Sequence, residues 1–213
     1  VVFTHSDVEA RNIYEDLSLY VNFVYFLPSR EMVFYNIDAI SGDLRWERLK
    51  VIRELLSPGK KIVVTSVEAL ASAYIPVNLY KEYTFSISVG DIKDFEDLNI
   101  KLIQSGYQRV DLVEGRGEFS IRGGILDIFP PSSPDPYRIE LFGDEVDSIR
   151  SFNTESQRSI EKVNNIEIFP AKEMILKSEN LEYAYSSMEK DLNSMLQKFK
   201  KAKNMEAHDK IKE

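Results

Sequence analysis

The order of strand-like and helix-like segments changes near residue 80, and this change is the strongest constraint on the fold. Before it, the two kinds of segment alternate. Apolar runs at Val1–Thr4, Val21–Leu27 and Lys61–Thr65 are separated by segments with helical spacing, such as Asp43–Leu56. Strand–helix alternation of this kind predicts a parallel sheet that is covered by helices.

Beyond residue 80 the segments are short and closely spaced. A strand at Phe85–Val89 and an amphipathic helix at Asp91–Ser105 precede six strand-like segments with glycine- or proline-bearing turns: Tyr107–Glu114, Glu118–Arg122, Ile125–Phe129, Tyr137–Phe142, Val146–Phe152 and Ile166–Phe169. This spacing predicts an antiparallel meander in a separate α+β domain.

The chain therefore divides into three expected parts. We expect an α/β domain over residues 1–81, an α+β domain over residues 82–171 and a C-terminal segment over residues 172–213. The last part contains one amphipathic helix at Asn180–Phe199, followed by a polar tail that we expect to fray.

Composition excludes several kinds of site. The 213-residue chain has no cysteine, and its two histidines, His5 and His208, lie at opposite ends, so disulfides and zinc sites built on cysteine are excluded. No stretch approaches the roughly 18 apolar residues of a membrane span, and the N-terminus does not read as a signal peptide. We expect a cytoplasmic protein with no metal, no cofactor and no membrane partner of its own. Its start within a strand-like run suggests a fragment.

Acidic residues are concentrated in the middle of the chain. The net charge is −8, and residues 84–171 carry 9 basic and 16 acidic side chains, a net of −7. This acidity argues against a general nucleic-acid coat. Six of those nine basic residues are arginine, whose planar guanidinium suits specific recognition of carboxylate or phosphate.

One segment predicts a specific arrangement of arginines. Glycine in the first turn position suits a two-residue type II′ hairpin, so we expect Gly115 and Arg116 at the tip of a hairpin that pairs Arg109 directly with Arg122. Strand alternation then gives one apolar face, with Val110, Leu112, Phe119 and Ile121, and one polar face, with Arg109, Asp111, Ser120 and Arg122.

Two arginines directly opposite each other disfavour folding by up to roughly 1 kcal/mol, so the pair needs a compensating anion. Glu140 or Asp147 of neighbouring strands could neutralise the pair within the domain. Alternatively, the pair could dock a phosphate or an acidic protein surface. The pattern alone leaves both interpretations open.

Other motifs have structural explanations. The segment Ser57–Lys61 has a Gly-Lys pair but follows a helix and precedes a strand, so it predicts a turn rather than a phosphate-binding loop. Gly115–Gly117 and Gly123–Gly124 join strands and predict turns. The acidic clusters at Asp94–Asp97 and Asp144–Asp147 predict a helix N-terminus and a solvated turn rather than metal sites.

The first region also contains aromatic and basic residues that could contact nucleic acid. Phe34, Tyr35 and Trp46 could stack on bases, but packing in the core is the more common role of such residues. We expect Arg45, Arg48, Lys50 and Arg53 to form the solvated side of one helix. Ser29–Glu31 is expected to be a structural loop.

A family resemblance covers essentially the whole chain. Residues Gly106–Pro130 (GYQRVDLVEGRGEFSIRGGILDIFP), Tyr137–Arg150 (YRIELFGDEVDSIR), Gln157–Ser159 and Ile168–Glu173 resemble the second domain of bacterial transcription-repair coupling factors (Mfd-type) and of the related excinuclease component UvrB. Upstream, Leu27–Glu31, Tyr35 and Val64–Leu70 are similar to the coupling factors' degenerate, helicase-like first domain.

The resemblance implies a docking function. In both families the second domain binds UvrA, the damage-recognition component of the excinuclease, and hairpin arginines lie at that interface. Arg109 and Arg122 match them by position, Arg116 is a weaker candidate, and Ser120 stands where UvrB has a further arginine. The α+β domain is then an insertion after which the C-terminal helix returns to the first domain. On this basis Arg109→Glu and Arg122→Glu should each abolish docking without unfolding the chain.

The resemblance also implies what lies outside this chain. The whole coupling factor is an ATP- and magnesium-dependent DNA translocase, and its motor and RNA polymerase-binding domains are absent here. We expect a binding fragment without ATPase activity. The alternatives are a fragment of the nucleotide-dependent repair enzyme UvrB and a DNA-binding module that uses the basic helix.

Overall fold

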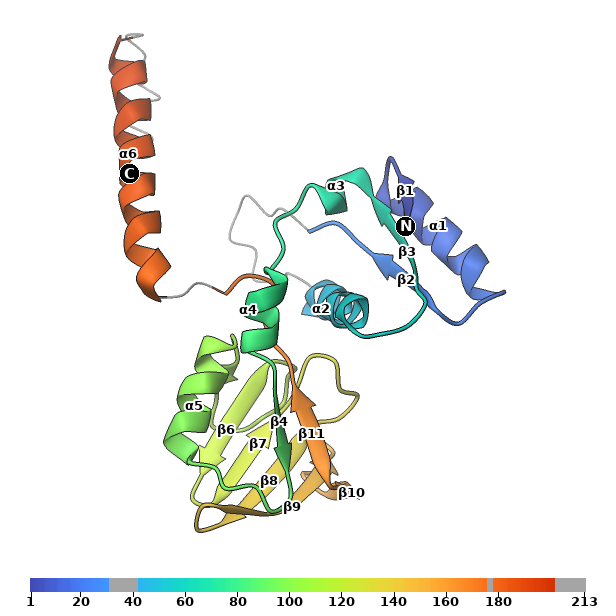
Figure 1. Cartoon of the computed structure of the whole chain (residues 1–213), viewed down its shortest axis with the longest axis vertical. Coiled ribbons are helices and arrows are strands. Elements are labelled where there is room, and N and C mark those ends of the chain that lie inside the picture. The colour runs from blue at the N-terminus through green and yellow to red at the C-terminus, as the bar shows by residue number, and fades with distance from the viewer. Residues whose placement is uncertain (31–41, 176–177, 202–213) are drawn as a thin grey trace. The chain divides into compact units, whose positions relative to one another are not determined.

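The chain forms two compact units in a computed structural model that describes residues 1–30, 42–175 and 178–201 (Figure 1). The first unit covers Val1–Ile175, and the second covers Leu176–Glu213. The first unit combines a parallel and an antiparallel sheet, and the second contains one long helix, as expected for this mixed α/β chain. The boundary near residue 82 stays a prediction.

The N-terminal part of the first unit is the predicted parallel sheet. Its strands β1 (Val2–Thr4), β3 (Ile62–Ser66) and β2 (Val24–Leu27) lie in the order β1-β3-β2, and both pairs are parallel. Helix α1 (Asp7–Ser18) packs on the sheet face that carries Val64, and helix α2 (Gly42–Leu56) packs on the face that carries Val63. Two short helices, α3 (Val67–Leu70) and α4 (Val77–Glu82), follow β3.

Local chemistry explains where these helices begin. The Ser6 side chain accepts a hydrogen bond from the Glu9 backbone N–H and caps α1, and Ser66 caps α3 in the same way through Ala69. Serine at this position satisfies one of the N–H groups that a helix start leaves without a partner. Helix α4, which was not predicted, has no side-chain cap of this kind.

The C-terminal part of the first unit is built on a six-stranded sheet with the order β10-β9-β8-β7-β6-β5. The strands are β5 (Gln108–Arg109), β6 (Glu118–Arg122), β7 (Ile125–Ile128), β8 (Tyr137–Phe142), β9 (Glu145–Phe152) and β10 (Ser159–Val163). Neighbours from β6 to β10 are antiparallel, which confirms the predicted meander. Strand β10 was not predicted.

One face of this sheet is apolar and covered. Helix α5 (Phe95–Gln104) and the antiparallel pair β4 (Phe85–Ser88) and β11 (Asn165–Ile168) contribute side chains to the same core as the sheet (Figure 1). The core includes Leu98 and Leu102 of α5 together with Phe119, Leu126 and Ile139 of the sheet. Because side chains alternate along a strand, the residues between these apolar ones point to the opposite face, which we call the outer face.

The predicted hairpin at Gly115-Arg116 is wrong. Strand β5 has two residues and runs parallel to β6, with Gln108 beside Glu118 and Arg109 beside Phe119. The antiparallel partner of β6 is β7, which pairs Arg122 with Ile125 around the turn at Gly123-Gly124. Arg109 and Arg122 are therefore not cross-strand neighbours.

Side-chain bonds explain why residues 110–117 leave the ladder. The Glu118 carboxylate accepts the backbone N–H groups of Glu114 and Gly115, at 2.9 and 2.7 Å, and so holds a loop where the hairpin was expected. Gly117 lies at φ +79°, a conformation that glycine adopts readily. The predicted apolar face is confirmed on β6, where Phe119 and Ile121 pack in the core, but it fails at Leu112, which is 41% exposed.

The second unit contains helix α6 (Ser178–Lys201), close to the predicted Asn180–Phe199. Its exposed apolar side chains are Tyr185, Met188, Leu192 and Met195. The tail expected to fray lies almost wholly outside the described residues.

Candidate protein-docking surface

Two arginines of the outer face share one buried carboxylate. Asp127 on β7 is 1% exposed, and it lies directly across from Arg138 on β8. Arg138 binds it with two parallel bonds, Nε to Oδ1 at 2.7 Å and Nη2 to Oδ2 at 2.8 Å, while Arg122 Nη2 binds Oδ2 at 2.9 Å. This geometry fixes both guanidinium groups relative to the sheet.

The contacts of Arg138 continue beyond Asp127. Its Nη2 also donates to Oε1 of Gln157 at 3.0 Å, and its guanidinium lies 4.7 Å from the centre of the Phe152 ring. The hydrogen bond to Asp127 raises the pKa of Arg138 above the usual range, against the opposing effect of burial. The side chain is therefore permanently charged and held rigidly.

A second ion pair extends the polar surface toward β9. Arg150 lies directly across from Arg138 and binds Glu140 and Ser148. The cluster thus has three guanidinium groups and two carboxylates, Asp127 and Glu140. The Nε atom of Arg150 is buried and has no hydrogen-bond partner among the described residues. Within this cluster, positive groups therefore outnumber negative ones by one, in a strongly acidic part of the chain.

An exposed aromatic ring lies on the same face. Leu141 packs against the apolar core, so the next residue on β8, Phe142, points to the outer side of the sheet. Its side chain is 86% exposed, which is unusual for a phenylalanine. An exposed aromatic ring on the same face as paired arginines is typical of protein-binding surfaces.

The three arginines named from the sequence lie in different places. Arg122 belongs to the outer-face cluster. Arg109 is exposed and approaches Asn99 of α5 at 3.4 Å, so it lies toward the covered face of the sheet. Arg116 donates from Nε to the Ser133 carbonyl at 3.3 Å and lies 5.3 Å from the Phe129 ring centre.

Arg122 is paired with a carboxylate of its own domain, but with neither Glu140 nor Asp147, the two that were predicted. Asp127 binds it, whereas Glu140 binds Arg150. The roles of Asp127, Arg138 and Arg150 were not predicted. A signal was available in the sequence. Asp127 is a charged residue within the apolar strand Ile125–Ile128, and a buried charge of this kind needs a hydrogen-bonding partner.

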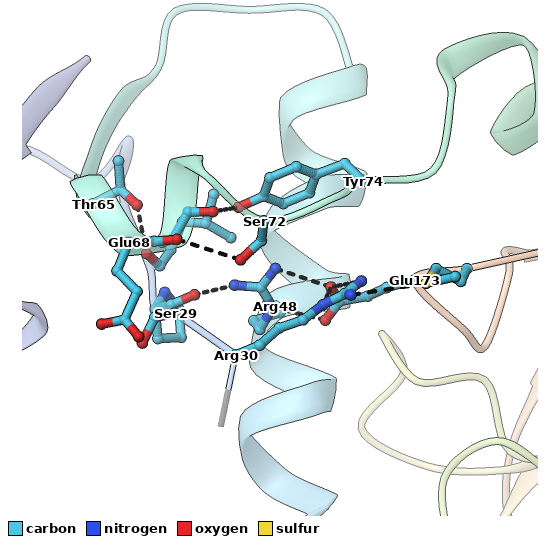
Figure 2. A network of polar contacts seen from close by, with 12 residues as sticks. Ser29, Arg30, Arg48, Thr65, Glu68, Ser72, Tyr74 and Glu173 are labelled. Atoms are coloured by element: carbon cyan, nitrogen blue, oxygen red, sulfur yellow. Dashed lines mark hydrogen bonds and ion pairs between the residues drawn. The ribbon is translucent and has the colours of Figure 1, made fainter. Parts of the chain in front are cut away.

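The prediction that Arg48 lies on a solvated helix face is wrong. Arg48 is 1% exposed and binds Glu173 with two bonds, Nε to Oε1 at 2.7 Å and Nη2 to Oε2 at 2.9 Å, and it also donates to the Pro28 carbonyl. Figure 2 shows Arg30 reaching the same Glu173 carboxylate, at 2.9 Å. Arg53 is not simply solvated either, since it lies over the Phe169 ring at 4.3 Å.

These contacts shift the pKa values of both partners. Burial by itself would raise the pKa of Glu173, but the hydrogen bonds and charges of Arg48 and Arg30 outweigh burial and lower it. Burial alone would lower the pKa of Arg48, but Glu173 raises it. The pair is a structural link between α2 and the segment after β11.

The remaining motifs have the structural roles that were expected. Ser57–Lys61 joins α2 to β3, Gly123-Gly124 is a turn, and Asp94 caps α5 by accepting the Glu96 N–H. Among the described residues, no group of three or more histidine and acidic side chains could hold a metal ion. Phe34 and Tyr35 lie outside those residues, and no helix within them is long and apolar enough to cross a bilayer.

Comparison of the sequence with known proteins relates this chain to a family. Residues 85–174 match the UvrB interaction domain family. The chain is 40% identical over 217 residues to the transcription-repair-coupling factor of Bacillus subtilis, a match that covers 98% of this chain and 18% of that protein. It is 33% identical over 192 residues to the coupling factor of Staphylococcus epidermidis, covering 89% of this chain and 16% of that protein.

The chain also matches a second class of relative. The UvrABC system protein B of Thermosipho africanus is 32% identical over 183 residues, covering 85% of this chain and 28% of that protein. The chain thus spans less than a third of each of these three relatives. Residues 85–174 therefore belong to the UvrB interaction domain family, and the chain is homologous over nearly all its residues to a segment of the transcription-repair-coupling factors.

Proposed function

We propose that this chain is the segment of a transcription-repair-coupling factor that docks UvrA, and that the outer face of the six-stranded sheet is the docking surface. Docking would bring nucleotide-excision repair to a stalled RNA polymerase, while polymerase and duplex DNA are bound by other parts of the whole protein. The match to an interaction domain and the greater identity to the coupling factor than to UvrB support this proposal.

The proposal rests on one observation, that the Arg122 side chain is held by a carboxylate and is still exposed. Its single carboxylate bond leaves the side chain 51% exposed, whereas the two bonds of Arg138 and the buried Asp127 form a rigid base beneath it. A fixed and still accessible guanidinium can bind a partner carboxylate without losing much conformational freedom. Phe142 supplies an exposed apolar contact on the same face.

The first region provides support for a function without ATP binding. Ligands of parallel α/β sheets bind outside the carboxyl ends of the strands. Here the Asp7 carboxylate occupies that edge, where it accepts the Ser29 N–H at 2.7 Å, the Ser29 hydroxyl at 2.8 Å and the Ser66 hydroxyl. A nucleotide phosphate would have to displace this internal anion. We therefore propose that the fragment neither binds nor hydrolyses ATP; saturable micromolar binding of labelled ATP would contradict this.

A binding experiment with purified UvrA tests the docking surface. Arg122→Glu and Phe142→Ala should each weaken binding by at least tenfold, because charged and aromatic anchors typically contribute about 2 kcal/mol or more. Circular dichroism should show that both variants remain folded.

Arg109→Glu is the matched control. It changes the same residue type by the same charge in the same domain, but toward the opposite face of the sheet. We expect it to bind UvrA nearly as well as the parent chain. Loss of binding in Arg109→Glu with normal binding in Arg122→Glu would place the interface on the other face and overturn the proposal.

A further inference from the structure

A groove outside the docking surface carries cations that lack carboxylate partners. Two cavities of about 400 and 500 Å³ lie side by side, and both are lined by Trp46 of α2 and by Arg116. The first also contains Arg45 and Lys172, and the second contains Lys50. We call the two cavities together the Trp46 groove.

The charge of this groove is opposite to that of the chain. Its lining has four cations, Arg45, Lys50, Arg116 and Lys172, and two carboxylates, Glu47 and Glu118. None of the four cations forms an ion pair with a described residue, although the chain has 35 acidic and 27 basic side chains. By contrast, Arg30, Arg48, Arg122, Arg138 and Arg150 all bind carboxylates.

Glu118 is already engaged. It accepts two backbone N–H groups of the loop at residues 114–115 and forms no ion pair with a groove cation. A groove with a local excess of positive charge in an acidic protein is suited to an anionic ligand.

The indole ring of Trp46 lies among these cations. The half-buried Trp46 ring borders both cavities, and Arg45 lies 5.6 Å from its centre. The edge of the ring is held against Gly117, where a Cβ atom would lie only 2.8 Å from it. A fixed indole and unpaired guanidinium groups together are the components that bind a nucleic-acid strand, with rings stacking on bases and cations on phosphates.

We propose that the Trp46 groove binds single-stranded nucleic acid. An acidic peptide would satisfy the cations but would make no use of the indole. Duplex DNA is disfavoured because its bases are already stacked on one another. The site is separate from the outer face, because it uses Arg116 and α2 rather than Arg122 and Arg138.

The test is a titration of the whole chain with a labelled 15-nucleotide oligothymidine, followed by fluorescence anisotropy and by the emission of Trp46, the only tryptophan. We expect saturable binding that quenches Trp46 emission. With about four phosphate contacts, the logarithm of affinity should fall with the logarithm of salt concentration at a slope of about −3. Trp46→Ala should weaken binding about fivefold or more, and Trp46→Phe should restore most of it.

Surface variants keep the proposal testable if Trp46→Ala is poorly folded. Arg116→Gln and Lys50→Gln should each weaken binding and reduce the salt slope by about 0.7. Lys60→Gln, an equal charge change at an exposed turn, and Arg122→Glu should leave oligonucleotide binding unchanged. The proposal is overturned if the oligonucleotide does not bind saturably, if a 15-residue polyglutamate or a duplex binds as well, or if the groove variants bind like the parent chain.

Discussion

Arg138 holds Asp127 with two parallel hydrogen bonds directly across β7 and β8, and Asp127 in turn holds Arg122. Asp127 is therefore the centre of the proposed docking surface although it is too buried to touch a partner. A residue in this position acts by placing the two arginines and not by contact.

Replacing Asp127 separates these roles. Asp127→Asn removes the charge that three hydrogen bonds use, so we expect the free energy of unfolding to fall by about 2–3 kcal/mol. Binding of UvrA should fall as well, because Arg122 and Arg138 lose their fixed positions. Urea denaturation and a binding titration measure the two effects. Unchanged stability would show that the carboxylate is not the anchor described here.

The buried pair of Arg48 and Glu173 should be needed for stability. Removing Glu173 leaves Arg48 as an uncompensated buried charge, so Glu173→Leu alone should cost about 3–5 kcal/mol. Arg48→Met alone should cost less, because Arg30 still binds Glu173. The double variant, with both charges absent, should be considerably more stable than the sum of the single changes predicts. A double-mutant cycle by urea denaturation measures this coupling, and simple additivity would contradict it.

Low pH should reduce the contribution of the Arg48–Glu173 ion pair to stability. The pKa of Glu173 is lower in the folded chain than the value of about 4.3 for an unfolded glutamate, so its contribution to stability is complete above that pH. The contribution is lost as the pH falls through the folded pKa. Glu173→Gln should therefore be less stable than the parent chain at pH 6, and the difference should shrink below about pH 4. A constant difference down to pH 3 would contradict the shift.

Gly117 should be intolerant of a side chain. It lies at φ +79°, and an added Cβ would approach the Trp46 ring at 2.8 Å. Gly117→Ala should lose about 1–2 kcal/mol from backbone strain and should also shift the emission of Trp46. Gly123→Ala is the control, because Gly123 also has positive φ but has no neighbour within 4 Å. It should be destabilised without a change in emission, and equal spectra for both variants would refute the contact.

The sequence by itself determined most of the helices and strands of this protein, although not α4 or β10. The change from strand–helix alternation to short strands predicted the parallel and antiparallel sheets, and the serine caps, the glycine turn at 123–124 and the amphipathic helix α6 follow from local chemistry. The motif at Gly106–Pro130 also indicated the family. These signals are local, so they are readable from neighbours in the chain.

Tertiary structure alone decided which residues meet. The glycines at 115 and 117 fit a tight hairpin, but Glu118 binds the backbone of that segment, and β5 pairs parallel to β6. Arg122 therefore binds Asp127, which Arg138 also binds, and does not lie opposite Arg109. Arg48 is buried and binds Glu173, which is 125 residues away in the sequence. Strand register and burial depend on pairing between distant segments, and a one-residue change in register moves each side chain to the other face of the sheet.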